Sequence, residues 1–142
     1  MNGNAHGTLV LLGDRGVLIT GPSGSGKSSL ALDLIAHAEG FARLVSDDRV
    51  LIESGRQGRS IGRAPSVIAG QIEIRGIGIV ARPFEPRAVI DLVVELVDPE
   101  SVTRMPEPTE CDGVPHLRVP WRSCAMARQH VAAALDRAKS GL

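Results

Sequence analysis

Residues 21–28 read Gly-Pro-Ser-Gly-Ser-Gly-Lys-Ser and match the motif G-x-x-x-x-G-K-[ST] at every fixed position. An apolar run, residues 17–20, precedes the motif, and a stretch with helical periodicity follows it. This order predicts a strand, a tight loop and a helix whose N-terminus begins at the loop. It is the feature of the sequence that most restricts the fold.

Each residue type in the motif suits the binding of phosphate. Glycines let backbone N–H groups turn inward around phosphate oxygens, and the helix N-terminus adds free donors. Lys27 is expected to reach the β- and γ-phosphates, and the Ser28 hydroxyl to hold Mg²⁺. The alternative is a glycine- and serine-rich turn that caps a helix by chance. The predicted nucleotide-binding residues are Gly21, Pro22, Ser23, Gly24, Ser25, Gly26, Lys27 and Ser28.

Length and charge exclude several classes of protein. A chain of 142 residues, 43% of them apolar, suits one compact domain spanning residues 1–142. The 16 basic and 16 acidic residues cancel, which argues against nonspecific binding of nucleic acid. We find no apolar run long enough to span a membrane and no signal peptide, so we expect a cytoplasmic protein with Cys111 and Cys124 reduced.

The remaining pattern predicts a strand-rich α/β fold with one early and one late helix. Two runs around a Gly-Asp turn, residues 8–12 and 17–20, predict a hairpin, and Gly40 is expected to end the first helix. We predict helices at 28–38 and 122–139, strands at 43–46 (with 50–53 as its continuation), 88–97 and 117–119, and loops at 54–63 and 98–116. The glycine- and arginine-rich segment 54–63 fits either a solvated hairpin tip or a basic loop that contacts a partner.

Two adjacent aspartates, Asp47 and Asp48, follow the short strand at 43–46. Side chains of neighbouring residues in a strand point to opposite sides, so the two carboxylates are expected to serve different roles. One can face a metal ion and the other an incoming nucleophile. The alternative is a polar turn at the end of a strand, where aspartate is common.

Four segments, in order, resemble the catalytic domain of HPr kinase/phosphorylase: His6-Gly7, the motif at 21–28, Leu-Val-Ser-Asp-Asp at 44–48 and Glu-Ile-Arg-Gly-Ile-Gly-Ile at 73–79. The resemblance implies a phosphate-loop fold with a mixed sheet like that of phosphoenolpyruvate carboxykinase. It implies an ATP- and Mg²⁺-dependent protein kinase that phosphorylates a serine of an HPr-like phosphocarrier of the sugar phosphotransferase system. The family also runs the reverse phosphorolysis and forms hexamers, so a homo-oligomer is expected.

The resemblance also assigns roles to single residues. It makes Asp48 the proton acceptor, and it gives catalytic roles to His6, Lys27 and Arg104 as well. It makes Ser28, Asp47 and Glu73 the metal-binding residues. It likens the segment 119–122 to one used mainly in the reverse reaction, with Arg122 in place of a lysine. Taken without the resemblance, His6 fits an exposed terminal residue, Glu73 and Arg75 fit a cross-strand ion pair, and Arg104 fits an ordinary loop arginine.

The sequence departs from the family pattern in several places. Ser29 stands where many members have glutamate, and the stretch 38–41 is slightly longer. The common form has an N-terminal domain before the catalytic one, whereas this chain begins just before His6, so regulation through that domain is not expected. Two alternatives remain: a nucleotide-binding switch without transfer activity, and a kinase for a small molecule.

Overall fold

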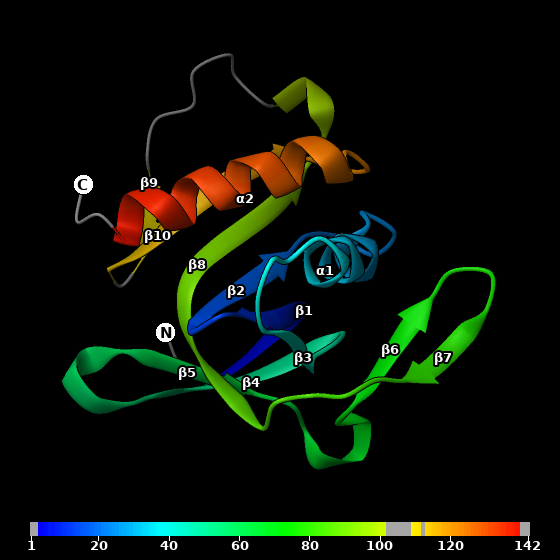
Figure 1. Cartoon of the computed structure of the whole chain (residues 1–142), viewed down its shortest axis with the longest axis horizontal. Helices are drawn as coiled ribbons and strands as arrows, with labels where there is room; N and C mark the ends of the chain where they lie inside the picture. Colours follow the sequence, from blue (N-terminus) through cyan, green and yellow to red (C-terminus); the bar gives the residue numbers. More distant parts are fainter. Residues whose placement is uncertain (1–2, 102–108, 112, 140–142) are drawn as a thin grey trace.

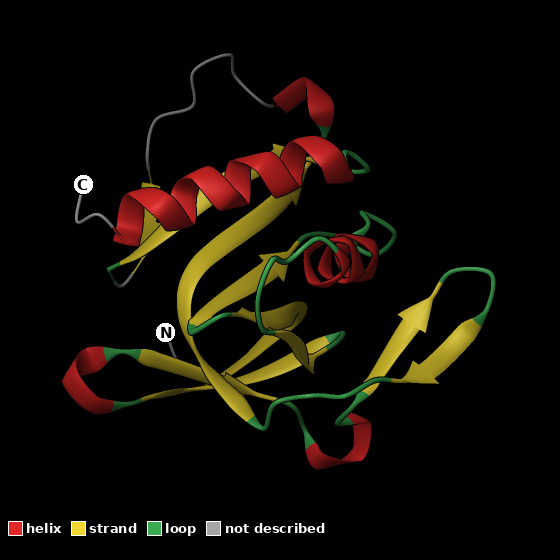
Figure 2. Cartoon of the chain, in the orientation of Figure 1, coloured by secondary structure: helices red, strands yellow, loops and turns green. Residues whose placement is uncertain are grey.

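The computed structural model describes residues 3–101, 109–111 and 113–139. Two α-helices and ten strands are arranged as Figure 1 shows, and Figure 2 distinguishes the helices from the strands by colour. The helices are α1 (Lys27–Ala36) and α2 (Cys124–Lys139). The strands are β1 (Gly3–Leu12), β2 (Arg15–Thr20), β3 (Ala42–Ser46), β4 (Arg49–Ser54), β5 (Ser60–Arg63), β6 (Gln71–Ile74), β7 (Gly78–Ala81), β8 (Arg87–Val97), β9 (Thr109–Cys111) and β10 (Val114–Pro120). Short 3₁₀ turns lie at Arg56–Gly58, Ser66–Ile68 and Pro99–Ser101.

Eight of the described strands form one sheet that folds over on itself, because β1 and β8 each belong to both of its halves. In the first half, β1 lies between β2 and β3, and β8 lies between β2 and β10. In the second half, the beginning of β1 pairs with β4, and β5 joins β4 to the beginning of β8. Figure 1 shows β8 as the long curved strand that connects the two halves.

The alternating side chains of the shared strands fill two separate cores. On one face, Val10, Val17 and Ile19 pack against α1 and α2. On the other face, Leu9, Leu18 and Val93 pack against Val50 and Ile52 of β4. Neighbouring strand residues thus serve opposite cores, as a period of two requires. The helices cover the first half of the sheet, and the second half of the sheet covers its other face.

Several expected elements are confirmed. The predicted hairpin is β1–β2, with Leu9 opposite Leu18, and the apolar run 88–97 is the central strand β8. On α2, Ala127 and Val131 are fully buried and Ala134 and Leu135 pack at the edge of the core, as the predicted apolar stripe requires. The early and late helices both form, in a mixed rather than a doubly wound parallel sheet.

Other boundaries were wrong. Helix α1 ends at Ala36, with His37 as its C-cap, so Gly40 lies beyond the helix end. The segment 50–53, by contrast, does continue β3 as predicted: β4 pairs with the beginning of β1 in the same antiparallel sense as β3, and only Asp47 and Asp48 interrupt the strand. The helix predicted from residue 122 begins at Cys124.

The two predicted loops contain strands. In the first, the predicted hairpin tip is confirmed at 55–59, and residues 60–63 form β5 antiparallel to β4, with Gly62 close to Leu9 and Val50 of the second core. In the second, residues 109–111 form β9, and β10 begins at Val114, earlier than the predicted 117–119. Local composition suggested irregular chain, but pairing with neighbouring strands decided these segments.

Strands β6 and β7 form a separate two-stranded hairpin. Its glycine turn, at Gly76, allows the tight reversal, with a φ of 84°. Figure 1 shows this hairpin standing apart from the main sheet, beside α1. It carries the Glu-Ile-Arg-Gly-Ile-Gly-Ile segment.

Candidate functional site

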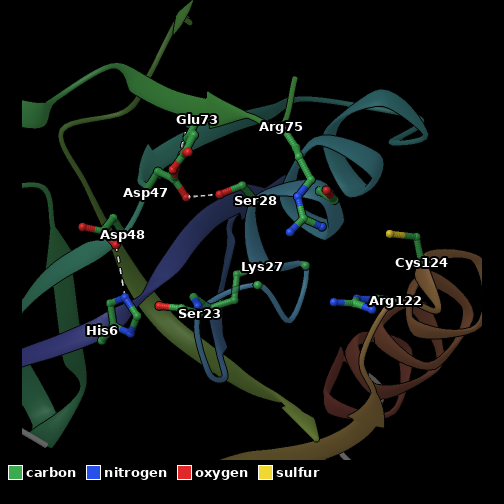
Figure 3. Close-up of a pocket in the computed structure, with 13 residues that line it drawn as sticks. His6, Ser23, Lys27, Ser28, Asp47, Asp48, Glu73, Arg75, Arg122 and Cys124 are labelled. Carbon is green, nitrogen blue, oxygen red and sulfur yellow. Dashed lines mark hydrogen bonds and ion pairs between the residues drawn. The ribbon is translucent and has the colours of Figure 1, made fainter. Parts of the chain in front are cut away.

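A polar pocket lies at the carboxyl ends of the parallel strands of the sheet. Strands β2, β8 and β10 run parallel, and the loop after β2 and the turn after β10 both emerge from their carboxyl ends. Open α/β sheets bind their ligands at the carboxyl ends of their strands. The polar pocket has a volume of about 550 Å³ and is lined by His6, Ser23, Gly24, Gly26, Lys27, Ser28, Ser29, Asp47, Asp48, Glu73, Arg75, Arg122 and Cys124. Figure 3 shows the labelled side chains converging from segments far apart in the sequence, from His6 on β1 to Cys124 on α2.

The glycine-rich loop, residues 21–26, connects β2 to α1. Gly21, Gly24 and Gly26 have positive φ values of 150°, 80° and 101°, a region that side chains with a Cβ rarely adopt. A Cβ at Gly21 would also lie 3.0 Å from the carbonyl oxygen of Leu96. The Ser25 side chain is buried, and its hydroxyl has no hydrogen-bond partner among the described residues. The loop therefore places glycines where the backbone needs them and leaves one hydroxyl free for a ligand.

Lys27 begins α1 and folds back onto the glycine-rich loop. Its ammonium donates hydrogen bonds of 3.0 and 3.1 Å to the carbonyl oxygens of Gly21 and Pro22. Burial lowers the pKa of Lys27, while the nearby carboxylates of Asp48 and Asp47 act in the opposite direction. The side chain is 8% exposed, so the charge is held in a partly desolvated site where an anionic ligand would interact with it strongly.

Asp47 is a buried carboxylate that gathers three hydrogen-bond donors. Its Oδ1 accepts from the Thr8 hydroxyl at 2.8 Å and from the Ser28 hydroxyl at 2.7 Å. Its Oδ2 accepts from the backbone N–H of Glu73 at 3.0 Å. Asp47 thereby joins β1, α1 and β6 at one point.

Asp48 points the other way, as predicted, although it lies outside β3 and does not have a strand backbone. Its side chain is 74% exposed, and its Oδ1 lies 3.1 Å from Nε2 of His6. The residue adopts a left-handed backbone with φ 73°, which aspartate tolerates better than most side chains. Its carbonyl oxygen accepts a hydrogen bond from the backbone N–H of Gly7, so β1 also holds the chain between β3 and β4 beside His6.

The oxygen-rich donor set suits Mg²⁺. The Ser28 hydroxyl donates a hydrogen bond to Asp47, which leaves the lone pairs of the serine oxygen available to a cation. Mg²⁺ is usually held by one or two protein oxygens together with phosphate and water oxygens. Among the described residues, no group of three or more His, Cys, Asp and Glu side chains is arranged to hold a metal ion. The residues present thus fit a metal that arrives with a phosphate ligand.

The predicted site residues that the structure describes all line this pocket, except Gly21, Pro22 and Ser25 of the glycine-rich loop. Arg104 lies outside the described residues. Glu73 reaches the pocket on β6. The alternative, an ion pair between Glu73 and Arg75, is not found: the ion pairs of the described residues join other side chains.

Sequence reasoning missed Cys124, which lines the polar pocket from the first turn of α2. Burial raises the pKa of the Cys124 thiol, and the nearby Asp33 raises it further. No local pattern marks this cysteine, because only the docking of α2 brings it to the pocket. Arg122 reaches the pocket from the preceding turn with a left-handed φ of 59°.

The fold and the pocket define an α/β domain with a mixed sheet, whose polar site lies at the carboxyl ends of its parallel strands. The family model described as HPr Serine kinase C-terminal domain matches residues 1–120. The chain belongs to this family.

Individual relatives agree. The HPr kinase/phosphorylase of Geobacter sulfurreducens is 35% identical over 132 residues, covering 82% of this chain and 40% of that protein. The HPr kinase/phosphorylase of Halalkalibacterium halodurans is 41% identical over 107 residues, covering 68% of this chain and 33% of that protein. A solved structure, that of the Hpr(Ser) kinase/phosphatase from Coxiella burnetii, superposes with a TM-score of 0.80 at 26% identity, covering 96% of this chain and 93% of the other. This chain spans about two fifths or less of the length of these two curated relatives.

Proposed function

We propose that this chain is an ATP- and Mg²⁺-dependent protein serine kinase acting on an HPr-like phosphocarrier of the phosphotransferase system. Residues 1–142 would form its single catalytic domain, a phosphate-loop fold with a sheet like that of phosphoenolpyruvate carboxykinase. The observation that carries the proposal is the exposed Asp48–His6 pair in the same pocket as Lys27 and the Ser28–Asp47 pair. A proton acceptor and a phosphate-binding loop are the two components that phosphoryl transfer to a hydroxyl requires.

The glycine-rich loop and Lys27 would bind the nucleotide. Backbone N–H groups at the start of α1 and the free Ser25 hydroxyl would donate to phosphate oxygens. The Lys27 ammonium now donates to two loop carbonyls, and a phosphate would offer it stronger, charged acceptors. Arg122 and Arg75, which line the same pocket, would add positive charge around the transferred group.

Asp48 would act as the proton acceptor. The acceptor serine loses its proton to Asp48 as its oxygen attacks the γ-phosphorus and the bond to the β-phosphate oxygen breaks. His6, 3.1 Å from this carboxylate, would hold it in place and balance its charge. Run in reverse, the protonated Asp48 returns its proton to the serine oxygen as inorganic phosphate attacks phosphoserine, which would release pyrophosphate.

Ser28 and Asp47 would hold Mg²⁺, with Glu73 at the rim of the same pocket. When bound, this ion would neutralise charge on the phosphate oxygens during transfer. Asp47 would keep its place through Thr8 and the Glu73 backbone, contacts that do not depend on the metal.

Transfer of label tests the proposal. The chain is incubated with Mg²⁺, γ-labelled ATP and purified HPr-like carriers, and we expect label on a carrier serine. Asp48→Asn should abolish transfer and spare ATP binding, because asparagine also tolerates the left-handed backbone at this position. ATP binding without transfer to any carrier would contradict the kinase proposal and favour a nucleotide-binding switch, and label on a metabolite would favour a small-molecule kinase.

We further propose a cytoplasmic homo-oligomer, as the family resemblance implies. None of the helices in the described part of the chain is both long and apolar enough to cross a membrane. Light scattering on the purified chain would measure its mass in solution, and a mass of 15.0 kDa would contradict the oligomer.

A further inference from the structure

Helices α1 and α2 are joined by a short ion pair behind the polar pocket. Nε of Arg128 donates to Oδ2 of Asp33 at 2.8 Å, and the two side chains are only 33% and 19% exposed. His37 lies one turn along α1, with its Nδ1 3.3 Å from the other oxygen, Oδ1, of the same carboxylate. Nδ1 of His37 also lies 2.9 Å from the backbone carbonyl oxygen of Asp33, its hydrogen-bond partner, so the hydrogen bond that holds the Asp33 carboxylate comes from Arg128 of α2.

The ion pair lies one helical turn behind the pocket wall on each helix. Residues four apart share a helix face, so Asp33 lies beneath Ser29 and Arg128 lies beneath Cys124. Ser29 and Cys124 both line the polar pocket. The charges of Asp33 and Arg128 also act on the Cys124 thiol, because both side chains lie near it. The carboxylate raises the pKa of the thiol, and the guanidinium lowers it.

The N-terminus of α2 carries a strained turn into the pocket. Arg122 has a left-handed φ of 59°, which is costly for a long side chain and persists only where the surroundings enforce it. A Cβ built on Gly26 would lie 3.8 Å from the backbone nitrogen of Arg122, so the turn runs directly beside the glycine-rich loop. Figure 3 shows the Arg122 side chain directed across the pocket toward that loop.

This turn has an anchor on either side. On the sheet side, the backbone N–H of Trp121 donates to the carbonyl oxygen of Val97 at 2.9 Å. On the helix side, the Asp33–Arg128 pair ties the first turns of α2 to α1, the helix that begins at the glycine-rich loop. Ala127 and Val131 already bury the apolar face of α2 against the core, so the ion pair is not needed to cover that face.

We propose that Asp33 and Arg128 are positioning residues, which fix the N-terminus of α2 relative to the glycine-rich loop and so set where Arg122 meets the phosphates of the nucleotide. The identity of that ligand rests on the proposed function. Loss of the pair lets the Trp121–Arg122 turn move away from the loop. The expected result is weaker binding of the triphosphate, with a smaller effect on the rate of transfer once the nucleotide is bound.

The test uses Arg128→Gln, Asp33→Asn and the double variant in the full chain. Arg118→Gln is the matched control, since it removes the exposed Arg118–Glu95 pair on the neighbouring strand, which does not line the pocket. Three quantities are measured: the Kd of Mg·ATP by calorimetry, KM and kcat for transfer, and the fluorescence emission of Trp121. Trp121 is the only tryptophan in the chain and lies next to Arg122, so its emission reports the position of this turn.

We expect each single variant to raise Kd and KM for ATP about three- to tenfold, the range expected for a partly buried ion pair. The double variant should be no weaker than the singles, because the second substitution removes a contact already lost. Arg128→Lys should restore Kd to within about twofold of wild type, and Arg118→Gln should match wild type. Trp121 emission should shift in the two single variants and not in the control.

Two results would overturn the positioning role. One is a lower urea midpoint for Arg128→Gln with unchanged Kd, KM and Trp121 emission, which would make the pair purely structural. The other is additive losses in the double variant. If the wild type binds ATP but transfers no label, the proposed function fails while the variant series still tests the ion pair through Kd and emission. A wild type that binds neither ATP nor pyrophosphate would overturn both.

Discussion

The Ser28 hydroxyl donates a hydrogen bond of 2.7 Å to Oδ1 of Asp47, and this contact joins the first turn of α1 to the end of β3. Asp47 is 6% exposed, so its carboxylate depends on such donors to compensate for lost water. The same oxygen also accepts from the buried Thr8 hydroxyl. The residue that would contact the metal is therefore held by the fold before any ligand arrives.

Ser28→Ala should remove the proposed metal contact and leave the fold largely intact. We expect the affinity for Mg·ATP to fall at least about tenfold, the equivalent of one charge-assisted contact. The cost in stability should be about 1 kcal/mol, because Asp47 keeps Thr8 and the Glu73 backbone as donors. Ser29→Ala is the control, because Ser29 lines the same pocket and is not one of the three residues that donate a hydrogen bond to Asp47. Equal losses in both variants, measured by calorimetry, would contradict a special role for Ser28.

Local sequence was sufficient to predict the loop, the start of α1 and the two aspartates. The motif at 21–28 sets backbone and side-chain chemistry within eight residues, and its glycines do adopt the positive φ values that a tight loop needs. The opposite directions of Asp47 and Asp48 were predicted from strand alternation, but the two residues lie between β3 and β4, and Asp48 has a left-handed backbone with φ 73°. One is buried with three donors, and the other is exposed beside His6.

Tertiary pairing decided what the sequence could not. Residues 60–63 have little apolar content, yet they form β5 because Gly62 fits closely against Leu9 and Val50 from distant strands. Cys124 reaches the polar pocket only because α2 packs across the sheet. In both places the deciding contact joins residues far apart in the chain, and no window of local sequence contains it.

Lys27 gives the stability of the protein a defined dependence on pH. Burial lowers its pKa in the folded state, so in the range just below 10.5 the unfolded chain binds more protons than the folded one. The free energy of unfolding therefore rises with pH in this window, by at most about 1.4 kcal/mol per pH unit from this group. Lys27→Met lacks the group, so the stability of the wild type relative to the variant should increase as the pH rises toward 10.5 in urea denaturation. A difference that is flat or decreases with pH would show that the pKa of Lys27 is not lowered.

Gly16 lies where β2 passes closest to β8. A Cβ at this position would overlap with the backbone carbonyl of Val89, and backbone cannot rotate away as a side chain can. Gly16→Ala should therefore lower the free energy of unfolding by about 2–4 kcal/mol. Gly40→Ala is the matched control, because nothing lies within 4 Å of a Cβ there, and it should change stability by about 0.5 kcal/mol or less. Equal urea midpoints for the two variants would contradict the close approach of these strands.

Cys124 offers a chemical probe of the polar pocket. Burial and the nearby Asp33 raise the pKa of its thiol, so at pH 7.5 the reactive thiolate is scarce and a disulfide reagent should modify it more slowly than an unperturbed thiol. Raising the pH should accelerate the reaction. The measurement uses Cys111→Ser, which leaves Cys124 as the single thiol.

Because Cys124 lines the same pocket as Lys27 and Ser28, saturating Mg·ATP should slow its modification further, by about fivefold or more. Cys124→Ser, which retains Cys111, serves as the control and should show no such protection. Modification of Cys124 at an unchanged rate with ATP bound would place the nucleotide outside this pocket.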